Sequence, residues 1–290
     1  MTTRRIRRSI SIAVAAAAAL WLGPAGVALQ YGAESARTTQ PAGPTPRTAD
    51  GKVDFSGIWV VAGEGVKPDE QGNITYLSQG RPCHPGQECK PAINFERDSG
   101  VRQRMSANLP LYKPEYWDKV QDLDVNGTLK DPIVRCYPPG LPRIGPPAKI
   151  VQTPTEILLL YLIHNTFRVI PADGRSHHPI RSQDLTYYGD SVGMWEGDTL
   201  VIDSVGFTDE SWLAWPGYFH SNNMRVVERL RRDGNTLTWQ AIVHDPDVLT
   251  QPWEMTPVTR TLNPDPKALL TEDLPCEDRD AKHVTTRERG

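Results

Sequence analysis

The second half of the chain, from Lys149 to Leu262, is a succession of short strand-like runs separated by turn sequences. The runs are rich in β-branched and aromatic residues, and Gly, Asp or Asn stands at most of the breaks. This composition is typical of antiparallel strands joined by short turns. Helical periodicity is almost absent from the region. The predicted strands are 149–153, 157–164, 166–171, 185–195, 199–207, 224–232, 236–244 and 255–262.

This succession predicts an all-β fold, a lipocalin-like antiparallel β-barrel over residues 146–265, with a β-sandwich as the alternative. Closing the sheet into a barrel removes the strand edges that would otherwise pair with other chains. A barrel of about eight strands leaves space for packed side chains or for one small ligand. The run 157–164 is almost entirely apolar, which predicts a strand that is buried on both faces.

Residues 51–145 have a different texture, because they are rich in Pro, Gly and charged residues. They contain one predicted strand, 55–62, and one short predicted helix, 114–123. Prolines fix φ and remove backbone donors, so the run 136–143 is expected to be an extended wrapping segment. The barrel is therefore expected to follow a loop-rich N-terminal segment, and residues 266–290 to form a C-terminal tail.

The first 28 residues have the layout of a secretory signal, with four arginines before the apolar run 10–22 and small residues after it. That run is shorter than the roughly 20 apolar residues a membrane-spanning helix needs. We therefore expect a periplasmic or secreted protein with no stable membrane insertion after cleavage. An uncleaved anchor, and twin-arginine export through Arg7-Arg8, are the alternatives. Residues 29–50 are polar and contain several Pro and Thr residues, which predicts a disordered linker.

All four cysteines follow the predicted signal, and an even number of cysteines in an oxidising compartment indicates disulfides. Of the three possible pairings we favour Cys83–Cys89, which closes a small loop, together with Cys136–Cys276. The first pair would clip the loop-rich segment, and the second would tie the start of the barrel region to the tail. The C-x-x-C spacing of many zinc sites does not occur.

The charge pattern and the missing cofactor motifs exclude several classes of function. The net charge is −3, and no block of like charge lies outside the predicted signal. Nucleic acids and anionic membranes are therefore not expected partners, since both need clustered Lys and Arg. The sequence contains no P-loop and no G-x-G-x-x-G, so no nucleotide cofactor is expected. The serine-hydrolase elbow G-x-S-x-G is also missing.

Two acidic residues interrupt apolar rows on predicted strands and are candidates for catalysis. Asp203 shares a row with Val201 and Val205, and Glu228 shares one with Val226 and Leu230. A buried carboxyl group whose pKa is raised can act as a general acid or base. The competing interpretation is a structural ion pair with Arg168 or Arg229.

The aromatic segment 212–221 carries the remaining catalytic candidate, His220, which we place beside Glu228 as an acid or base. The segment is interpreted either as a lid over the barrel mouth or as a packed plug. The adjacent His177 and His178 lack a third ligand at useful spacing, so no metal site is expected. The residues expected to line a ligand are Arg168, Trp195, Trp212, Trp215, Tyr218 and Trp239.

Two motifs carry a resemblance. Residues 50–59, DGKVDFSGIW, are similar to an opening "DGxPDxSGxW", with Val53 where the motif has Pro. Residues 189–202, GDSVGMWEGDTLVI, are similar to the signature "GDSVGxWEGDTLVV", with Ile202 in place of its last Val. Together they resemble a large family of exported bacterial proteins of unknown function, over most of residues 50–278. The resemblance implies export and a β-rich fold, and no activity. Within the signature, Glu196-Gly197-Asp198 has ordinary turn chemistry and is interpreted as structural.

Three functional hypotheses follow. The first is an exported protein that binds a small, largely apolar or aromatic molecule in the barrel lumen. The second is a cofactor-free lyase, isomerase or hydrolase that uses Asp203, Glu228 and His220 in the same lumen. The third is a structural envelope protein whose barrel is filled by its own side chains. Convergence of the three polar residues on a cavity would favour the enzyme.

Overall fold

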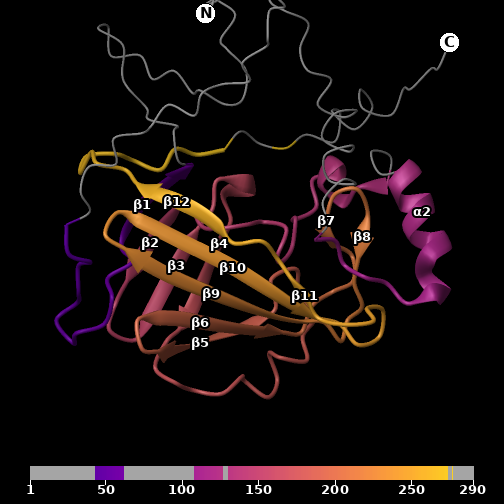
Figure 1. The fold of residues 1–290 in the computed structure, drawn as a ribbon, viewed down its shortest axis with the longest axis horizontal. Helices are drawn as coiled ribbons and strands as arrows, with labels where there is room; N and C mark the ends of the chain where they lie inside the picture. Colours follow the sequence, from indigo (N-terminus) through magenta and orange to yellow (C-terminus); the bar gives the residue numbers. More distant parts are fainter. Residues whose placement is uncertain (1–42, 62–107, 127–129, 274–275, 277–290) are drawn as a thin grey trace, which may run out of the picture. The chain divides into compact units, whose positions relative to one another are not determined.

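The computed structural model describes residues 43–61, 108–126, 130–273 and 276, and these form one strand-dominated unit (Figure 1). Nine strands follow one another around a curved antiparallel sheet. In chain order they are β1 Gly57–Val61, β2 Lys149–Gln152, β3 Glu156–Leu160, β4 Phe167–Pro171, β5 Asp190–Glu196, β6 Thr199–Val205, β9 Arg225–Asp233, β10 Thr236–His244 and β12 Val258–Leu262.

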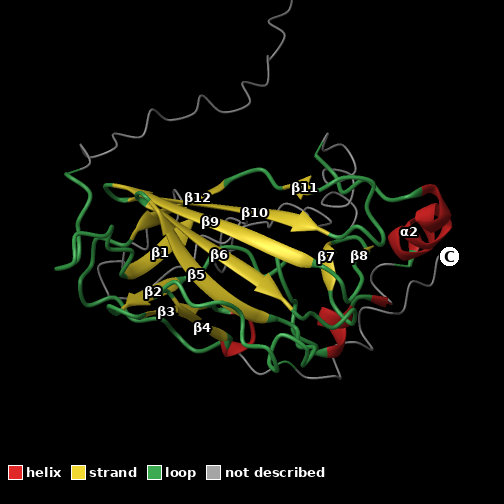
Figure 2. Ribbon diagram, turned by 90° about the horizontal axis from the view of Figure 1, so that it is seen from below, coloured by secondary structure: helices red, strands yellow, loops and turns green. Residues whose placement is uncertain are grey.

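The sheet is a nearly closed barrel, as the strand pattern predicts. Its order is β4-β3-β2-β1-β12-β10-β9-β6-β5, so β1 fills the position between β2 and β12. Trp59 pairs with Leu262 on one side of β1, and Gly57 pairs with Ile150 on the other. Figure 2 shows the result, with β2–β4 lying across the interior from β9 and β10. The predicted strand 55–62 therefore belongs to the barrel sheet and not to the loop-rich segment that precedes the other strands.

The barrel has one seam, formed by β4 and β5, where no backbone ladder joins the two strands in the described part of the chain. Each strand in the order is antiparallel to its neighbour, so with nine strands the two end strands, β4 and β5, point the same way. Side chains hold the seam instead, since Arg168 Nη2 donates to Ser191 Oγ over 3.0 Å. A Cβ atom on Gly193 would lie 3.2 Å from Ile170 Cγ2 and 3.2 Å from the Pro171 carbonyl oxygen. A glycine in β5 thus lets β4 pack closely.

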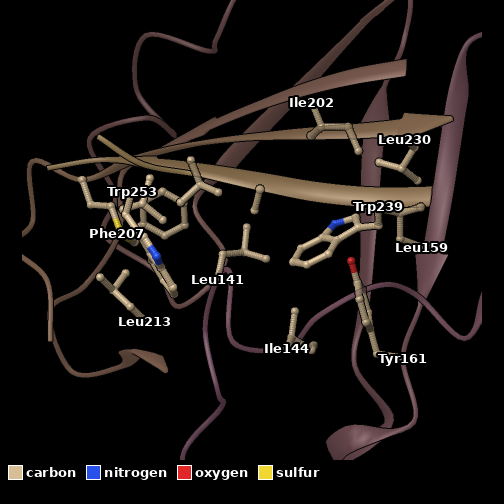
Figure 3. Close-up of a cluster of buried hydrophobic side chains, with 14 of the residues drawn as sticks. Leu141, Ile144, Leu159, Tyr161, Ile202, Phe207, Leu213, Leu230, Trp239 and Trp253 are labelled. Carbon is tan, nitrogen blue, oxygen red and sulfur yellow. The ribbon is translucent and has the colours of Figure 1, made fainter. Parts of the chain in front are cut away.

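Alternate residues of each strand point into the barrel and are buried. On β9 and β10 the inward positions include Val226, Leu230, Leu237 and Ala241, none of which is exposed. The segment between Cys136 and β2 adds Leu141 and Ile144 to the same core, and Figure 3 shows Leu141 beside Trp239 and Ile144 below it. The interior is therefore lined largely by side chains in mutual contact.

The prediction that 157–164 is a strand buried on both faces is wrong. β3 ends at Leu160, and the 3-10 turn η3 (Ile163–Asn165) follows, in which His164 and Asn165 adopt positive φ values of 54° and 50°. Only every second residue of β3 is buried, and the neighbouring strand β4 leaves Phe167 66% exposed on the outer face. The apolar run therefore places half of its strand residues in the core and the other half on the outer, partly exposed face of an antiparallel sheet.

Smaller elements close one end of the barrel. The 3-10 turn η1 (Pro114–Tyr116) leads into helix α2 (Trp117–Val125), which confirms the predicted helix. The aromatic segment 212–221 forms a hairpin of β7 (Trp212–Ala214) and β8 (Tyr218–Phe219), and its aromatic side chains join the buried core. A short strand, β11 (Trp253–Glu254), pairs with β10, and a second 3-10 turn, η2 (Pro132–Arg135), precedes the wrapping segment. Within the described ranges, no helix has the length and apolar character needed to cross a membrane.

Covalent and polar ties hold the outlying parts. The predicted disulfide Cys136–Cys276 is confirmed, with Cα atoms 5.5 Å apart. Cys83 and Cys89 lie outside the described residues, as do the predicted signal 1–28 and most of the predicted linker. The last part of that linker, residues 43–50, makes specific contacts. Arg47 binds Asp198 through two hydrogen bonds of 2.8 and 2.7 Å, so this part of the predicted linker is fixed against the turn between β5 and β6.

Candidate functional site in the barrel interior

The two acidic candidates lie on opposite faces of the sheet. Glu228 pairs with Ile202 across the β6–β9 ladder, whereas Asp203 pairs with Val227. Residues opposite each other in a ladder share a face, so Glu228 points inward and Asp203 outward. The predicted acid/base pair of Asp203 and Glu228 is therefore not formed.

Asp203 belongs to a polar cluster on the outside of the barrel. Arg225 donates two hydrogen bonds to its carboxylate, over 2.7 and 2.9 Å. Burial alone would raise the pKa of Asp203, but Arg225, with His177 nearby, holds that pKa below its ordinary value. The geometry is that of a bidentate ion pair, which stabilises the ionised carboxylate.

Glu228 forms a buried ion pair with Arg168, as one of the two sequence interpretations proposed. Arg168 Nη2 lies 2.7 Å from Glu228 Oε2. Arg168 is 5% exposed and Glu228 is not exposed at all. Burial would lower the pKa of Arg168, but the Glu228 carboxylate and the Tyr161 hydroxyl outweigh it and raise that pKa. The guanidinium therefore stays charged inside the barrel.

Four uncharged polar groups surround this pair, and we call the six residues the polar island. Arg168 Nη1 donates to the Tyr161 hydroxyl over 3.1 Å, and Nη2 donates to Ser204 Oγ over 3.2 Å. Trp239 Nε1 donates to Glu228 Oε1 over 2.9 Å. Burial raises the pKa of Tyr161, so its hydroxyl stays protonated. The members of the polar island are Tyr161, Arg168, Ser191, Ser204, Glu228 and Trp239.

Two atoms of the polar island have no hydrogen-bond partner among the described residues. They are Arg168 Nε, a donor, and Glu228 Oε2, an acceptor that only the ion-pair contact approaches. Most buried polar atoms in folded proteins are hydrogen-bonded, so each exception asks for a cause such as a bound molecule. Both atoms belong to one ion pair and therefore lie close together.

The fold explains how these residues meet. Arg168 projects inward from the second position of β4 at the seam, and Ser191 and Ser204 approach it from β5 and β6. The hydroxyls of Ser191 and Ser204 are 2.8 Å apart. The sequence pointed to Arg168, Glu228 and Trp239 and missed the other three members. Ser204 belongs to the row of its predicted strand opposite to Asp203, which the sequence interpretation did not take as core-facing. Ser191 belongs to the signature motif, and Tyr161 lies within an apolar run.

The predicted ligand-lining aromatics divide into two groups. Trp239 lies in the lumen, and Trp195 stacks on Phe55 with ring centroids 5.8 Å apart. Trp212, Trp215 and Tyr218 belong to the β7–β8 hairpin and its turn. In that region Tyr112 stacks on Tyr218, and the Arg143 guanidinium lies over the Trp212 ring. The sequence grouped them with the lumen residues, because an aromatic pattern does not tell a lining from a plug.

His220 is buried in the hairpin region and does not contact Glu228. Its Nδ1 lies 2.9 Å from the Ser221 carbonyl oxygen, and its Nε2 lies 2.9 Å from Ser211 Oγ. A carbonyl only accepts, so Nδ1 carries the hydrogen and Nε2 accepts from Ser211. Burial lowers the pKa of His220. The structure thus does not bring Asp203, Glu228 and His220 together.

His177 bridges two carboxylates on the outer face. Its Nδ1 lies 3.1 Å from Asp190 Oδ2, and its Nε2 lies 3.5 Å from Asp203 Oδ2. Across residues 43–61, 108–126, 130–273 and 276, no three His, Cys, Asp or Glu side chains form a group that could hold a metal ion. The neighbouring His178 ring accepts backbone N–H bonds in its own loop.

The signature motif has structural roles at several positions. Gly197 takes a positive φ of 59° in the turn between β5 and β6, where Glu196-Gly197-Asp198 was predicted to be structural. Glu196 accepts a hydrogen bond from Arg229 over 2.6 Å. With Gly193 at the seam, these contacts give the motif a role in shaping the barrel. No family model, no curated protein and no solved structure matches the chain.

Proposed function

We propose that this protein is an exported β-barrel that binds a small, largely apolar or aromatic molecule in its lumen, with the polar island as the anchor. The observation that carries the proposal is a pair of buried atoms in the barrel interior: Arg168 Nε has no hydrogen-bond partner, and Glu228 Oε2 has no hydrogen bond beyond its ion-pair contact with Arg168 Nη2. Ligand sites in proteins commonly combine apolar walls with a few convergent polar groups.

Folding alone does not account for the polar island. Replacing a buried ion pair with well-packed apolar residues is often neutral, or stabilises a protein by about 1–4 kcal/mol. A barrel that served only as scaffold would therefore need no charged pair at positions 168 and 228 for its stability. The charged pair therefore supports a role in recognising something.

The surroundings limit the size of the ligand. Leu159, Ile202 and Leu230 are buried around Trp239 and offer apolar contacts (Figure 3). Leu141 and Ile144 occupy part of the same interior, so the bound molecule must be small. If the lumen takes no guest, this packing fits the structural envelope protein instead.

Export and family membership belong to the same proposal. The Cys136–Cys276 disulfide is typical of an oxidising compartment, which supports a periplasmic or secreted location. The two motifs support membership of the exported family that they resemble. The enzyme hypothesis receives no such support, because Asp203, Glu228 and His220 lie on different parts of the fold.

The test is native mass spectrometry of the full chain, expressed with its own N-terminal segment and purified from the periplasm. We expect an additional bound mass on the wild type and none on the double variant Arg168→Met/Glu228→Leu. The matched control, Arg225→Met/Asp203→Leu, removes the outer ion pair and should keep the bound mass. Absence of any bound mass in all three proteins, with each shown to be folded by circular dichroism, would overturn the proposal.

A further inference from the structure

We infer that the molecule held by the polar island is uncharged at the point of contact, and that its polar group offers one hydrogen-bond acceptor and one donor. A carboxamide or a hydroxyl group has this chemistry. The inference rests on the proposed function and specifies the class of ligand for the same site.

Charge balance sets the first condition. Arg168 contributes one positive charge and Glu228 one negative charge, and the other four members of the polar island are neutral. The pair is almost completely shielded from water. A carboxylate or ammonium group brought beside it would be a buried charge without a counter-charge, which is strongly unfavourable. The site therefore selects against ions of either sign.

Hydrogen-bond capacity sets the second condition. The guanidinium of Arg168 already donates to Tyr161, Ser191 and Ser204, and Trp239 donates to Glu228 Oε1. The atoms of the polar island that make no hydrogen bond are Arg168 Nε, a donor, and Glu228 Oε2, an acceptor whose ion-pair contact with Arg168 Nη2 leaves room for a further donor. A guest that satisfies both must accept from the first and donate to the second.

A single water molecule meets the same two conditions and is the competing occupant. The apolar walls distinguish the two, because a guest with an alkyl body also contacts Leu159, Ile202 and Leu230. Such a guest gains affinity from the apolar surface that it buries, which water does not. Binding of a neutral amphiphile therefore separates a ligand site from a hydration site.

The experiment compares four probes of six carbons each, namely hexanamide, hexan-1-ol, hexanoate and hexylammonium, at neutral pH by isothermal titration calorimetry. For the wild type we expect the two neutral probes to bind at least about tenfold more tightly than either ion. The variant Glu228→Gln keeps the shape of the side chain and removes its charge. In that variant Arg168 loses its counter-charge, so hexanoate should become the preferred probe.

The outcomes separate the inference from the proposed function. If an ion binds the wild type as tightly as the neutral probes, the inference is wrong and the proposed function stands. If no probe binds but the purified protein carries a bound molecule, the charge of that molecule is the test. A neutral molecule supports the inference, and an ion contradicts it. If no probe binds and no mass is carried, both fail. Should Glu228→Gln not fold, the wild-type comparison decides alone.

Discussion

Arg168 and Glu228 meet within 2.7 Å, although their strands, β4 and β9, are not neighbours in the sheet. β5 and β6 stand between them on one side of the barrel. The ion pair therefore connects β4, at the seam, to β9 through the interior of the barrel. This relationship makes the pair a test of both stability and binding.

Removing one partner should cost far more stability than removing both. Glu228→Leu leaves the Arg168 guanidinium buried without a counter-charge, and we expect a loss of about 3–5 kcal/mol in the free energy of unfolding. Arg168→Met/Glu228→Leu should lose much less, because no charge is left unpaired. Urea unfolding followed by tryptophan fluorescence measures both. Additive losses in the double variant would contradict a coupled pair.

The buried histidine should make stability depend on pH. Burial lowers the pKa of His220 from its ordinary value of 6.5, so the unfolded chain binds the proton more readily than the folded chain. Its contribution to stability is complete above pH 6.5 and is lost as the pH falls through that value toward the lowered folded pKa. We expect the urea midpoint to fall in that window, and to fall less in His220→Gln. His244→Gln serves as the control, and an unchanged pH profile in His220→Gln would contradict the assignment.

The seam should not tolerate a larger residue in β5. In Gly193→Val, the added Cβ would press on Ile170 Cγ2 and the Pro171 carbonyl oxygen, each 3.2 Å away. Overpacking of this kind costs about 1–3 kcal/mol, so the melting temperature should drop. At Gly43 nothing lies within 4 Å of a built Cβ, so Gly43→Val is the matched control and should melt like the wild type. Equal melting of both variants would mean that β4 and β5 can separate without cost.

The one-sided burial of β3 and β4 gives a pair of contrasting substitutions. Leu159 is completely buried, and Leu159→Ala should cost about 2–5 kcal/mol because it leaves a cavity in the core. Phe167 is 66% exposed on the outer face, and Phe167→Ser should change stability by only about 0.5 kcal/mol. Chemical denaturation compares the two. Similar losses would show that the outer face is covered in solution.

The sequence predicted the barrel well, because short strands and turn residues are local signals. It predicted the hairpin β9–β10 almost to the residue, since Asp233-Gly234-Asn235 is strong turn chemistry. It did not place β1 in the barrel. The partners of β1 lie far along the chain, in β2 and β12, and a local pattern carries no information about such a pairing.

The site was predicted in part for a similar reason. Glu228 was found because its row is otherwise apolar and only one face of β9 is buried. Asp203 was placed on the wrong face because β6 is buried on both sides, with Val201 5% exposed outside and Ile202 0% inside. Alternation cannot choose between two buried rows. The partners Tyr161 and Ser191 come from other strands, and only the closed fold brings them to Arg168.

The position of β1 has a consequence for how the protein acquires its structure. β1 lies near the start of the described chain, yet one of its two partners, β12, is among the last strands to be made. The disulfide likewise joins Cys136 to Cys276, 140 residues later. Contacts of such high contact order form slowly, because a long loop must close before they are gained. The barrel therefore cannot close before residues 258–262, which form β12, have been made.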